Sequence, residues 1–317
     1  MEAQKFNLVL IHNSHQFGVQ DFVRLRDLIH GANDDIKVLV GPDSPVPLHI
    51  QNSLGEKRTL VFSPTPIKYF RPRGAAIFCG EFVDKFQQAK IFEEHGIPTP
   101  KTEIVTGESR FSETEWGPFV ILKPTNTTMG FRGAGIELVR TNKVKFIPRS
   151  DYPADHPGRQ GSMLVQQSIS SGEHSENYRV LTMFGEPLYA FKRKQLTPVP
   201  DLSDPELVSA IDGVMTHSAS GQRDAEYCYE EDVLEFARNM YSALPHAPMQ
   251  GCDIRREEGT GKLFALEFNA GGFTWAFSQP LPEANPAPDT PRREEQFGAF
   301  EIMARTLAER TRELASK

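Results

Sequence analysis

The sequence predicts an α/β protein made of α+β lobes: an N-terminal parallel α/β lobe, a small central lobe and a C-terminal α+β lobe. Three observations support this fold class. The chain begins with a strand–helix–strand pattern, and two hairpin patterns follow in its second half. Its 317 residues are also enough for two or three lobes.

The N-terminal part alternates between strand and helix. An apolar strand at 6–12 is followed by helical spacing of apolar residues over 21–30 and by a second strand at 36–41. This order favours a parallel sheet. A further strand at 74–80 precedes an amphipathic helix at 81–95, which Gly96 ends and two prolines follow.

The central part is expected to form a smaller α+β lobe. A strand at 118–124 ends at a proline, and a glycine-containing loop leads from it to a strand at 135–140. A polar stretch at 149–161 then connects to a strand at 163–169. The C-terminal part has a hairpin pattern at 178–195 that turns near Gly185, a helix at 230–244, a second hairpin at 250–272 and a final helix at 294–314.

Charge and composition limit the classes of partner. The net charge is −7, from 35 basic and 42 acidic residues, which disfavours a general nucleic-acid or anionic-membrane surface. Cys79, Cys228 and Cys252 are far apart and in no metal-binding spacing, so we expect free thiols in a reducing compartment. The N-terminal apolar run is too short for a signal peptide or a membrane span, so we expect a cytoplasmic protein.

The second hairpin carries the most informative acidic residues. If the three-residue loop Gly259-Thr260-Gly261 is the turn, Asp253 lies opposite Glu267, where two like charges repel. Asn269 projects from the same face because it lies two residues beyond Glu267. Such an oxygen-rich set suits Mg²⁺ or Mn²⁺ shared with phosphates. The alternatives are a solvated face, or a shorter turn that shifts the register.

The glycine loop after Lys123 is a second candidate site. The run TNTTMGFRGAG contains three glycines and small or hydroxyl residues, which let backbone N–H groups approach phosphate oxygens. It lacks the Walker A motif and is not followed by a helix, so it predicts a flap between two strands. A surface hairpin without a ligand is the alternative.

The first hairpin is rich in cations. With its centre near Gly185-Glu186, Arg179 faces Lys192, or Arg193 if the register moves by one. An anion between them, a phosphate or a carboxylate, would compensate for the repulsion. Long side chains solvated on an edge strand are the alternative. His217 is a candidate ligand, and an ordinary polar loop is the alternative. Trp275 is a candidate pocket residue, and aromatic packing is the alternative.

Five segments between about residues 80 and 273 together resemble the ATP-grasp superfamily, which includes D-alanine–D-alanine ligase, glutathione synthetase and the ribosomal-protein glutamate ligases. These segments are VDKFQQAKIFEEHGIPTPKT, FVILKP with its flap, LVQQSISSGEH, YRVLTMFGEPLYAFKR and CDI…LFALEFNAGG. The chain differs from the family in its longer flap, in Gln166 where many members have Glu, and in AGGFTW after Asn269.

The resemblance implies a nucleotide site and a metal site. ATP would contact Lys85, Lys123 and the flap, and its base would contact a hinge at residues 166–169. The ribose would contact Glu173. The residues implied for the cofactor are Lys85, Lys123, Met129, Gly130, Gly133, Gly135, Gln166, Gln167, Ile169 and Glu173. Two Mg²⁺ ions would be held by Asp253, Glu267 and Asn269. The Asp253–Glu267 repulsion is then expected to be relieved only when nucleotide and metal arrive together.

The resemblance also implies an activity. Arg179, Arg193 and Lys192 would act catalytically on the transferred phosphoryl group or the substrate carboxylate, and His217, Arg223, Gly271 and Trp275 are candidates for substrate contacts. The implied enzyme joins a carboxylate to an amine through an acyl phosphate, without a protein nucleophile. The substrates are small molecules, amino acids or peptides, and neither nucleic acid nor a membrane is an expected partner. The oligomeric state stays open, although homodimers are common among similar proteins.

Two other activities stay open at this point: a kinase acting on a hydroxyl group, and a nucleotide-binding regulatory protein without turnover. A polyphosphate substrate for a kinase would need a denser basic pocket than Arg132, Arg179, Lys192 and Arg193 provide. The expected division of the chain is an N-terminal domain at 1–100, a small ATP-grasp subdomain at 101–172 and a C-terminal subdomain at 173–317.

Overall fold

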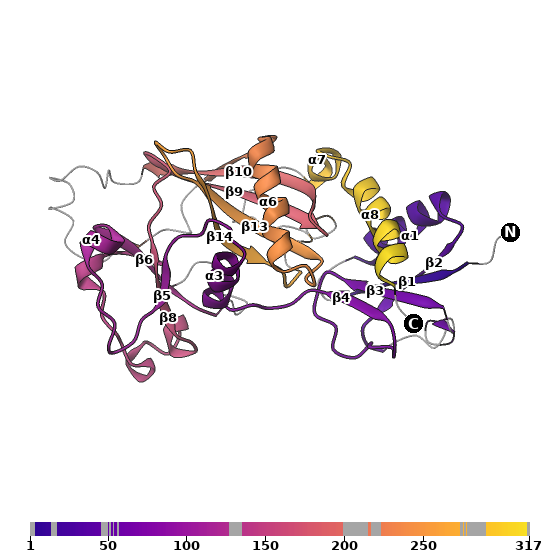
Figure 1. Cartoon of the computed structure of the whole chain (residues 1–317), viewed down its shortest axis with the longest axis horizontal. Helices are drawn as coiled ribbons and strands as arrows, with labels where there is room; N and C mark the ends of the chain where they lie inside the picture. The colour runs from indigo at the N-terminus through magenta and orange to yellow at the C-terminus, as the bar shows by residue number, and fades with distance from the viewer. Residues whose placement is uncertain are drawn as a thin grey trace.

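Three β-sheets follow one another along the long axis of the molecule (Figure 1). The computed structural model describes residues 4–13, 18–45, 50, 52, 54–55, 57–126, 135–198, 215–216, 223–272, 275, 277 and 290–315. One sheet has four strands and the other two have five each among these residues. The predicted α/β fold class with α+β lobes is confirmed.

The first sheet is parallel, as the strand–helix–strand start predicted. Its order is β2-β1-β3-β4, formed by β1 (Phe6–His12), β2 (Ile36–Pro42), β3 (Arg58–Ser63) and β4 (Ala76–Cys79). Helix α1 (Val19–Ala32) buries Phe22, Leu25 and Ile29 against Leu8 and Leu10 of the sheet. Strand β3 was not predicted. Its short apolar run TLVF is typical of a strand that is buried on both faces.

The second sheet is antiparallel, with the order β11-β7-β6-β8-β5. It consists of β5 (Thr102–Ile104), β6 (Phe119–Pro124), β7 (Glu137–Arg140), β8 (Met163–Gln167) and β11 (Met215–Thr216). Helix α4 (Glu113–Trp116) contributes the buried Trp116 to the core of this sheet. Three short 3-10 helices, Thr141–Lys143, Arg149–Asp151 and Pro157–Arg159, lie in the connection before β8.

The third sheet is also antiparallel and carries the candidate site. Its order is β12-β10-β9-β13-β14, formed by β9 (His174–Met183), β10 (Glu186–Pro198), β12 (Arg223–Tyr227), β13 (Met249–Arg256) and β14 (Leu263–Asn269). Tyr178, Val180 and Ile254 belong to a core that includes α6 (Glu231–Ala243) and α3 (Lys85–Glu94).

The opposite face of the third sheet changes character along its strands. Near Leu181 and Tyr189 it is apolar and joins the core that contains the first sheet. Further along the same face lie Arg179 and Asp253, because alternate strand residues share a face. The chain therefore places a group of charged residues directly beside a buried apolar core.

Two predicted helices have different bounds in the structure. The helix expected at 81–95 begins only at Lys85, because the Asp84 side chain accepts a hydrogen bond from the Phe86 amide and caps the first turn. The helix expected at 294–314 is two helices, α7 (Thr290–Glu295) and α8 (Ala299–Leu314). Gly298 separates them with a left-handed backbone, φ 73°.

Helix α8 packs against α1 and the first sheet, although it ends the chain (Figure 1). Strand β11 likewise pairs with β7 of the second sheet from a position far along the sequence. The predicted domain boundaries stay a prediction. In the part of the chain that the structure describes, every helix is too short or too polar to span a bilayer.

Candidate functional site

A row of charged side chains crosses the third sheet. Asp253 on β13 pairs with Glu267 on β14 and with Arg179 on β9, so the three side chains project from one face. The predicted opposition of Asp253 and Glu267 is confirmed. The pairs nearer the turn, from Arg256 with Leu263 to Ile254 with Ala265, are offset by one residue from the predicted register. An irregularity between Ile254 and Asp253 then brings Asp253 opposite Glu267.

Both carboxylates have a cationic partner from the protein itself. Arg179 donates to Asp253 with both branches, Nε to Oδ1 at 2.5 Å and a terminal nitrogen to Oδ2 at 2.7 Å. The Lys85 ammonium is ion-paired with Glu267. The expectation that only nucleotide and metal relieve the Asp253–Glu267 repulsion is therefore wrong, because Arg179 and Lys85 neutralise the pair first.

The register of the first hairpin differs from the prediction. Arg179 faces Phe191, whereas Lys192 faces Tyr178 and Arg193 faces Asn177. The turn is centred on Phe184 and Gly185, both with positive φ, and not on Gly185 and Glu186. Two cations therefore do not face each other directly.

This register separates the three predicted catalytic residues. Arg193 shares the face of Arg179 because its partner Asn177 is two residues from Arg179. Lys192 projects from the opposite face, where its ammonium lies 2.7 Å from Glu176. Arg179 and Arg193 thus lie on one face of the sheet, and Lys192 lies on the other.

Lys123 lies on β6 of the second sheet and completes the group. It is only 6% exposed, and its ammonium donates to Oε1 of Gln166 at 2.9 Å. Gln166 in turn donates to Thr102 at 3.1 Å, which fixes the orientation of the amide. We name Lys85, Lys123, Arg179, Asp253 and Glu267 the charged cluster.

Burial perturbs the two lysines of the charged cluster. It lowers the pKa of Lys85 to about 8, an effect that the Asp253 carboxylate opposes. Burial also lowers the pKa of Lys123 well below its ordinary value, and the nearby Lys85 charge lowers it further. The two lysines are neighbours because the Lys85 amide donates to the Thr125 carbonyl at the end of β6, at 2.9 Å.

Asn269 and Gly271 continue β14 beyond Glu267. The Asn269 amide donates to Oδ2 of Asp253 and to the Gly251 carbonyl, each at 3.3 Å. A Cβ atom at Gly271 would lie 2.3 Å from the Phe82 ring, so this position needs glycine. Asn269 therefore lies beside the carboxylates, and the ring of Phe82 covers the strand just after them.

The hinge segment, residues 166–169, lies at the end of β8 and just beyond it. Gln166 and Ile169 are buried, and Gln167 is half-buried. The backbone N–H of Gln167 donates to the Lys101 carbonyl at 2.8 Å. Glu173 is exposed in the turn before β9. The role predicted for these residues in nucleotide binding stays a prediction.

Arg255 is a site residue that the analysis of the sequence missed. It lies on the face of Asp253 two residues further along β13, and it donates to the backbone of the hinge segment at Ile169. Burial lowers its pKa to about 10, an effect that Asp253 opposes. The spacing Asp-x-Arg in the strand is the signal that could have identified it.

Among the remaining predicted site residues, Trp275 lies outside the charged cluster. Trp275 is fully buried, donates to Asp21 at 2.8 Å and stacks on Phe22 at 5.0 Å between ring centroids, so it packs in the core. Arg223 is the first residue of β12 and pairs with Gln195, but the structure does not describe its side chain. Gly135 has a positive φ of 73° just after the flap. Met129, Gly130, Gly133 and His217 lie outside the described residues.

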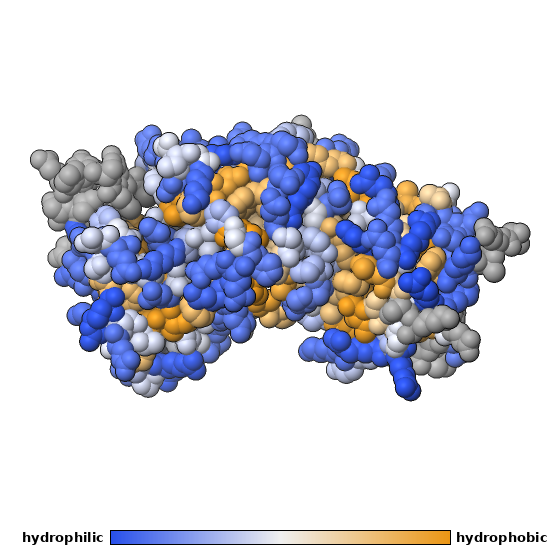
Figure 2. All heavy atoms as spheres, viewed as in Figure 1, coloured by the Kyte–Doolittle hydropathy of each residue, from blue (hydrophilic) through white to orange (hydrophobic). Residues whose placement is uncertain are grey.

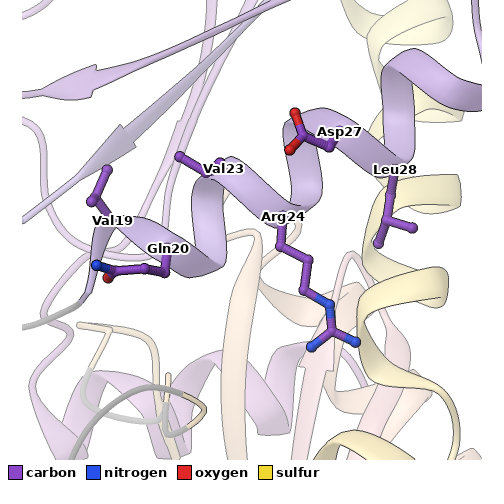
Figure 3. A pocket seen from close by; sticks show the side chains of 6 residues that line it. All are labelled: Val19, Gln20, Val23, Arg24, Asp27 and Leu28. Atoms are coloured by element: carbon purple, nitrogen blue, oxygen red, sulfur yellow. The ribbon is translucent and has the colours of Figure 1, made fainter.

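A pocket of about 520 Å³ lies elsewhere, along α1 (Figure 3). Its six lining residues, Val19, Gln20, Val23, Arg24, Asp27 and Leu28, all come from this helix, and none belongs to the charged cluster. The space-filling view in Figure 2 shows instead a hollow at the lower edge of the molecule, between the parts that contain the second and the first sheet.

The charges of this region favour an anionic ligand. Four cations, Lys85, Lys123, Arg179 and Arg255, lie around the two carboxylates of the cluster. Burial lowers the pKa of three of them, Lys85, Lys123 and Arg255. No group of three or more His, Cys, Asp and Glu side chains suited to a metal occurs among the described residues. A cation could be held by the two carboxylates together with the Asn269 amide and ligand oxygens.

Comparisons with known proteins bear on the fold. No family model matches the chain, and no curated protein sequence matches it. Among solved structures, the ATP-grasp ligase PsnB complexed with minimal precursor, Mg and ADP is 12% identical over 96% of this chain and 98% of its own, with a TM-score of 0.50. The macrocyclase MdnC bound with precursor peptide MdnA from Microcystis aeruginosa is 10% identical over 96% and 99%, also with a TM-score of 0.50.

At such identities the similarity concerns the fold alone. It extends over nearly the whole of both chains, and it agrees with the succession of a parallel sheet and two antiparallel sheets described above. The chain therefore has the ATP-grasp fold, as the order of its sequence motifs predicted.

Proposed function

We propose that the protein is an ATP- and Mg²⁺-dependent ligase that activates a carboxylate as an acyl phosphate and joins it to an amine. The observation that carries this proposal is the charged cluster. It combines two directly opposed carboxylates on one sheet face with three cations, Arg179 from the same face, Lys85 from α3 and Lys123 from β6. The ATP-grasp fold supports a ligase at the general level.

The cations fit the phosphate end of a nucleotide. Lys85 and Lys123 come from different elements, α3 and β6, and both have lowered pKa values that a polyanion would raise. We propose that Lys85 leaves Glu267 and Lys123 remains near Gln166 when they bind phosphate oxygens. Arg179 and Arg193 would then stabilise the transferred phosphoryl group from the sheet face that they share.

The carboxylates fit a divalent cation. Asp253, Glu267 and Asn269 supply oxygen ligands from adjacent strands, which is the donor set that Mg²⁺ prefers. When bound, Mg²⁺ would neutralise negative charge on the phosphates. Loss of Lys85 from Glu267 frees that carboxylate for the metal, so the same exchange would serve nucleotide and cation.

The reaction needs no protein nucleophile. The substrate carboxylate attacks the γ-phosphorus, ADP leaves, and the amine then displaces phosphate from the acyl phosphate. The chain contributes positioning and charge neutralisation through Arg179, Arg193 and Lys85. Lys192 is left out of this set because it lies on the opposite face with Glu176. The precursor peptide bound in the MdnC structure favours an amino acid or peptide as substrate here.

The test is ADP release measured over a matrix of carboxylates and amines, with hydroxylamine added to trap the acyl phosphate. A ligase releases ADP only when a suitable carboxylate is present, and it forms a hydroxamate. ADP release without a trapped acyl group, together with a stable phosphorylated product, would instead identify a kinase. Nucleotide binding without ADP release from any pair would identify a regulatory protein.

A further inference from the structure

Arg255 connects two parts of the chain that the proposed nucleotide site needs to hold together. Its backbone belongs to β13, two residues after Asp253 and on the same face. Its guanidinium reaches Ile169, just after β8, and Glu176, near the start of β9, both more than 70 residues earlier in the sequence. It is one of the cations beside the charged cluster, but its hydrogen bonds go to acceptors outside that cluster.

The contacts of Arg255 occupy all three guanidinium nitrogens. Nε donates to the Glu176 carbonyl at 3.2 Å, one terminal nitrogen donates to the Ile169 carbonyl at 3.3 Å, and the other donates to the Ser175 hydroxyl at 3.0 Å. Hydrogen bonds from a charged donor are stronger than neutral ones. The planar guanidinium can satisfy the three acceptors at once, whereas a lysine ammonium offers a single point of contact.

A second contact joins the same two segments. The Glu258 amide, just beyond β13, donates to the Ser170 carbonyl at 2.9 Å. A Cβ atom at Gly172 would lie 2.9 Å from the Glu258 carboxylate, so the chain after the hinge segment passes close to this hairpin. The hairpin that carries Asp253 and Glu267 is therefore packed on the hinge segment through both backbone and side chain.

We propose that Arg255 is a positioning residue of the nucleotide site, which holds the Ile169 carbonyl at a constant distance from the carboxylates of β13 and β14. This inference rests on the proposed function, since it takes residues 166–169 as the segment that contacts the base. A base is read by hydrogen bonds to such a segment, and a small displacement weakens them. Arg255 would thereby affect which base is accepted, although it does not contact the nucleotide.

The experiment compares the binding of ADP and GDP, each with Mg²⁺, to the full chain and its variants by titration calorimetry. In Arg255→Met we expect weaker ADP binding and a Kd ratio of GDP to ADP that falls by about tenfold, the effect of one lost hydrogen bond to the base. Arg255→Lys should fall between this variant and the wild type.

Arg256 offers a matched control. It lies next to Arg255 but on the other face, where it binds Glu230 and Asp232 at 2.8 Å, at the start of α6. Arg256→Met should lower the melting temperature and leave the GDP-to-ADP ratio unchanged. A general loss of stability in β13 would alter both variants alike, so the ratio separates positioning from stability.

The outcomes distinguish this inference from the proposed function. A folded Arg255→Met protein with the wild-type ratio overturns the inference alone, as does a wild-type protein that binds ADP and GDP equally. A wild-type protein that binds neither nucleotide overturns the proposed function and this inference with it. If Arg255→Met does not fold, Arg255→Lys decides by the same ratio.

Discussion

If Lys85 binds the phosphates of a nucleotide as proposed, nucleotide binding should depend on pH. The pKa of Lys85 is about 8 because the ammonium is buried, and a bound polyphosphate would raise this pKa. The protonated form therefore binds nucleotide more tightly. Below about pH 8 Lys85 is charged both with and without ligand, so it adds no pH dependence there.

Above this pH the free protein loses the proton and binding must restore it. With a pKa of about 8, about nine tenths of the Lys85 side chains are uncharged at roughly pH 9, so the affinity falls about tenfold, or about 1.4 kcal/mol, for each further pH unit. The fall ends when the pH reaches the pKa of the bound state. Lys85→Met removes this titration and should flatten the profile above pH 8.

The assay is calorimetric titration of ADP with Mg²⁺ between about pH 7 and 10, in buffers of different ionisation enthalpy that report the protons taken up. Lys90→Met is the matched control, because Lys90 is on the same helix and its ion pair with Glu93 is half exposed. Lys123, whose pKa is also lowered, can leave a shallower fall in Lys85→Met. An affinity of the wild-type protein that does not change between pH 8 and 10, or a Lys85→Met profile that falls as steeply as that of the wild type, would refute the assignment of this titration to Lys85.

Three further predictions concern the same region. Glu267→Gln should abolish Mg²⁺-dependent ADP release and keep the far-UV circular dichroism, and unchanged turnover would remove the metal assignment. Asp253→Asn should lower the free energy of unfolding in urea by about 3 kcal/mol, because it leaves the largely buried Arg179, whose side chain is 19% exposed, without its counterion. A double variant with Arg179→Met should recover part of this loss, and an equal or larger loss would contradict the explanation. Gly271→Ala should lower the melting temperature because its Cβ would lie 2.3 Å from the Phe82 ring. Adding Phe82→Ala should restore the melting temperature. A double variant as unstable as Gly271→Ala would instead indicate a clash with the backbone.

Local patterns in the sequence predicted the candidate site only as far as local geometry extends. Counting from the glycine turn placed Asp253 opposite Glu267, which the structure confirms. The pairs beside the turn are one residue off this count, and the irregularity between Asp253 and Ile254 restores it. The same counting failed for Arg179, because the turn lies one residue earlier and an irregularity between Pro187 and Tyr189 shifts the register again by one residue. Neighbouring residues of a strand point to opposite faces, so this register decides that Arg193, and not Lys192, shares the face of Arg179.

Contacts between distant parts of the chain could not be predicted in this way. Lys85 pairs with Glu267 across 182 residues, and Arg255 reaches Ile169 across 86. Neither pairing has a periodicity or a spacing in the sequence, because each depends on how α3 and β8 pack against the third sheet. For Trp275 the hydrogen bond to Asp21 and the stacking on Phe22 make it a core residue, although its position after Asn269 suggested a pocket.

The sequence by itself determined the class of the fold, the parallel start, the two hairpins and the carboxylate pair, because strand periodicity, turn residues and the order of motifs are local properties of the chain. Only the tertiary structure decided the state of charge of the site. It supplied Arg179 and Lys85 as partners for the carboxylates and buried Lys123. Burial and charge neighbours set the pKa values, and both depend on residues that folding alone brings together.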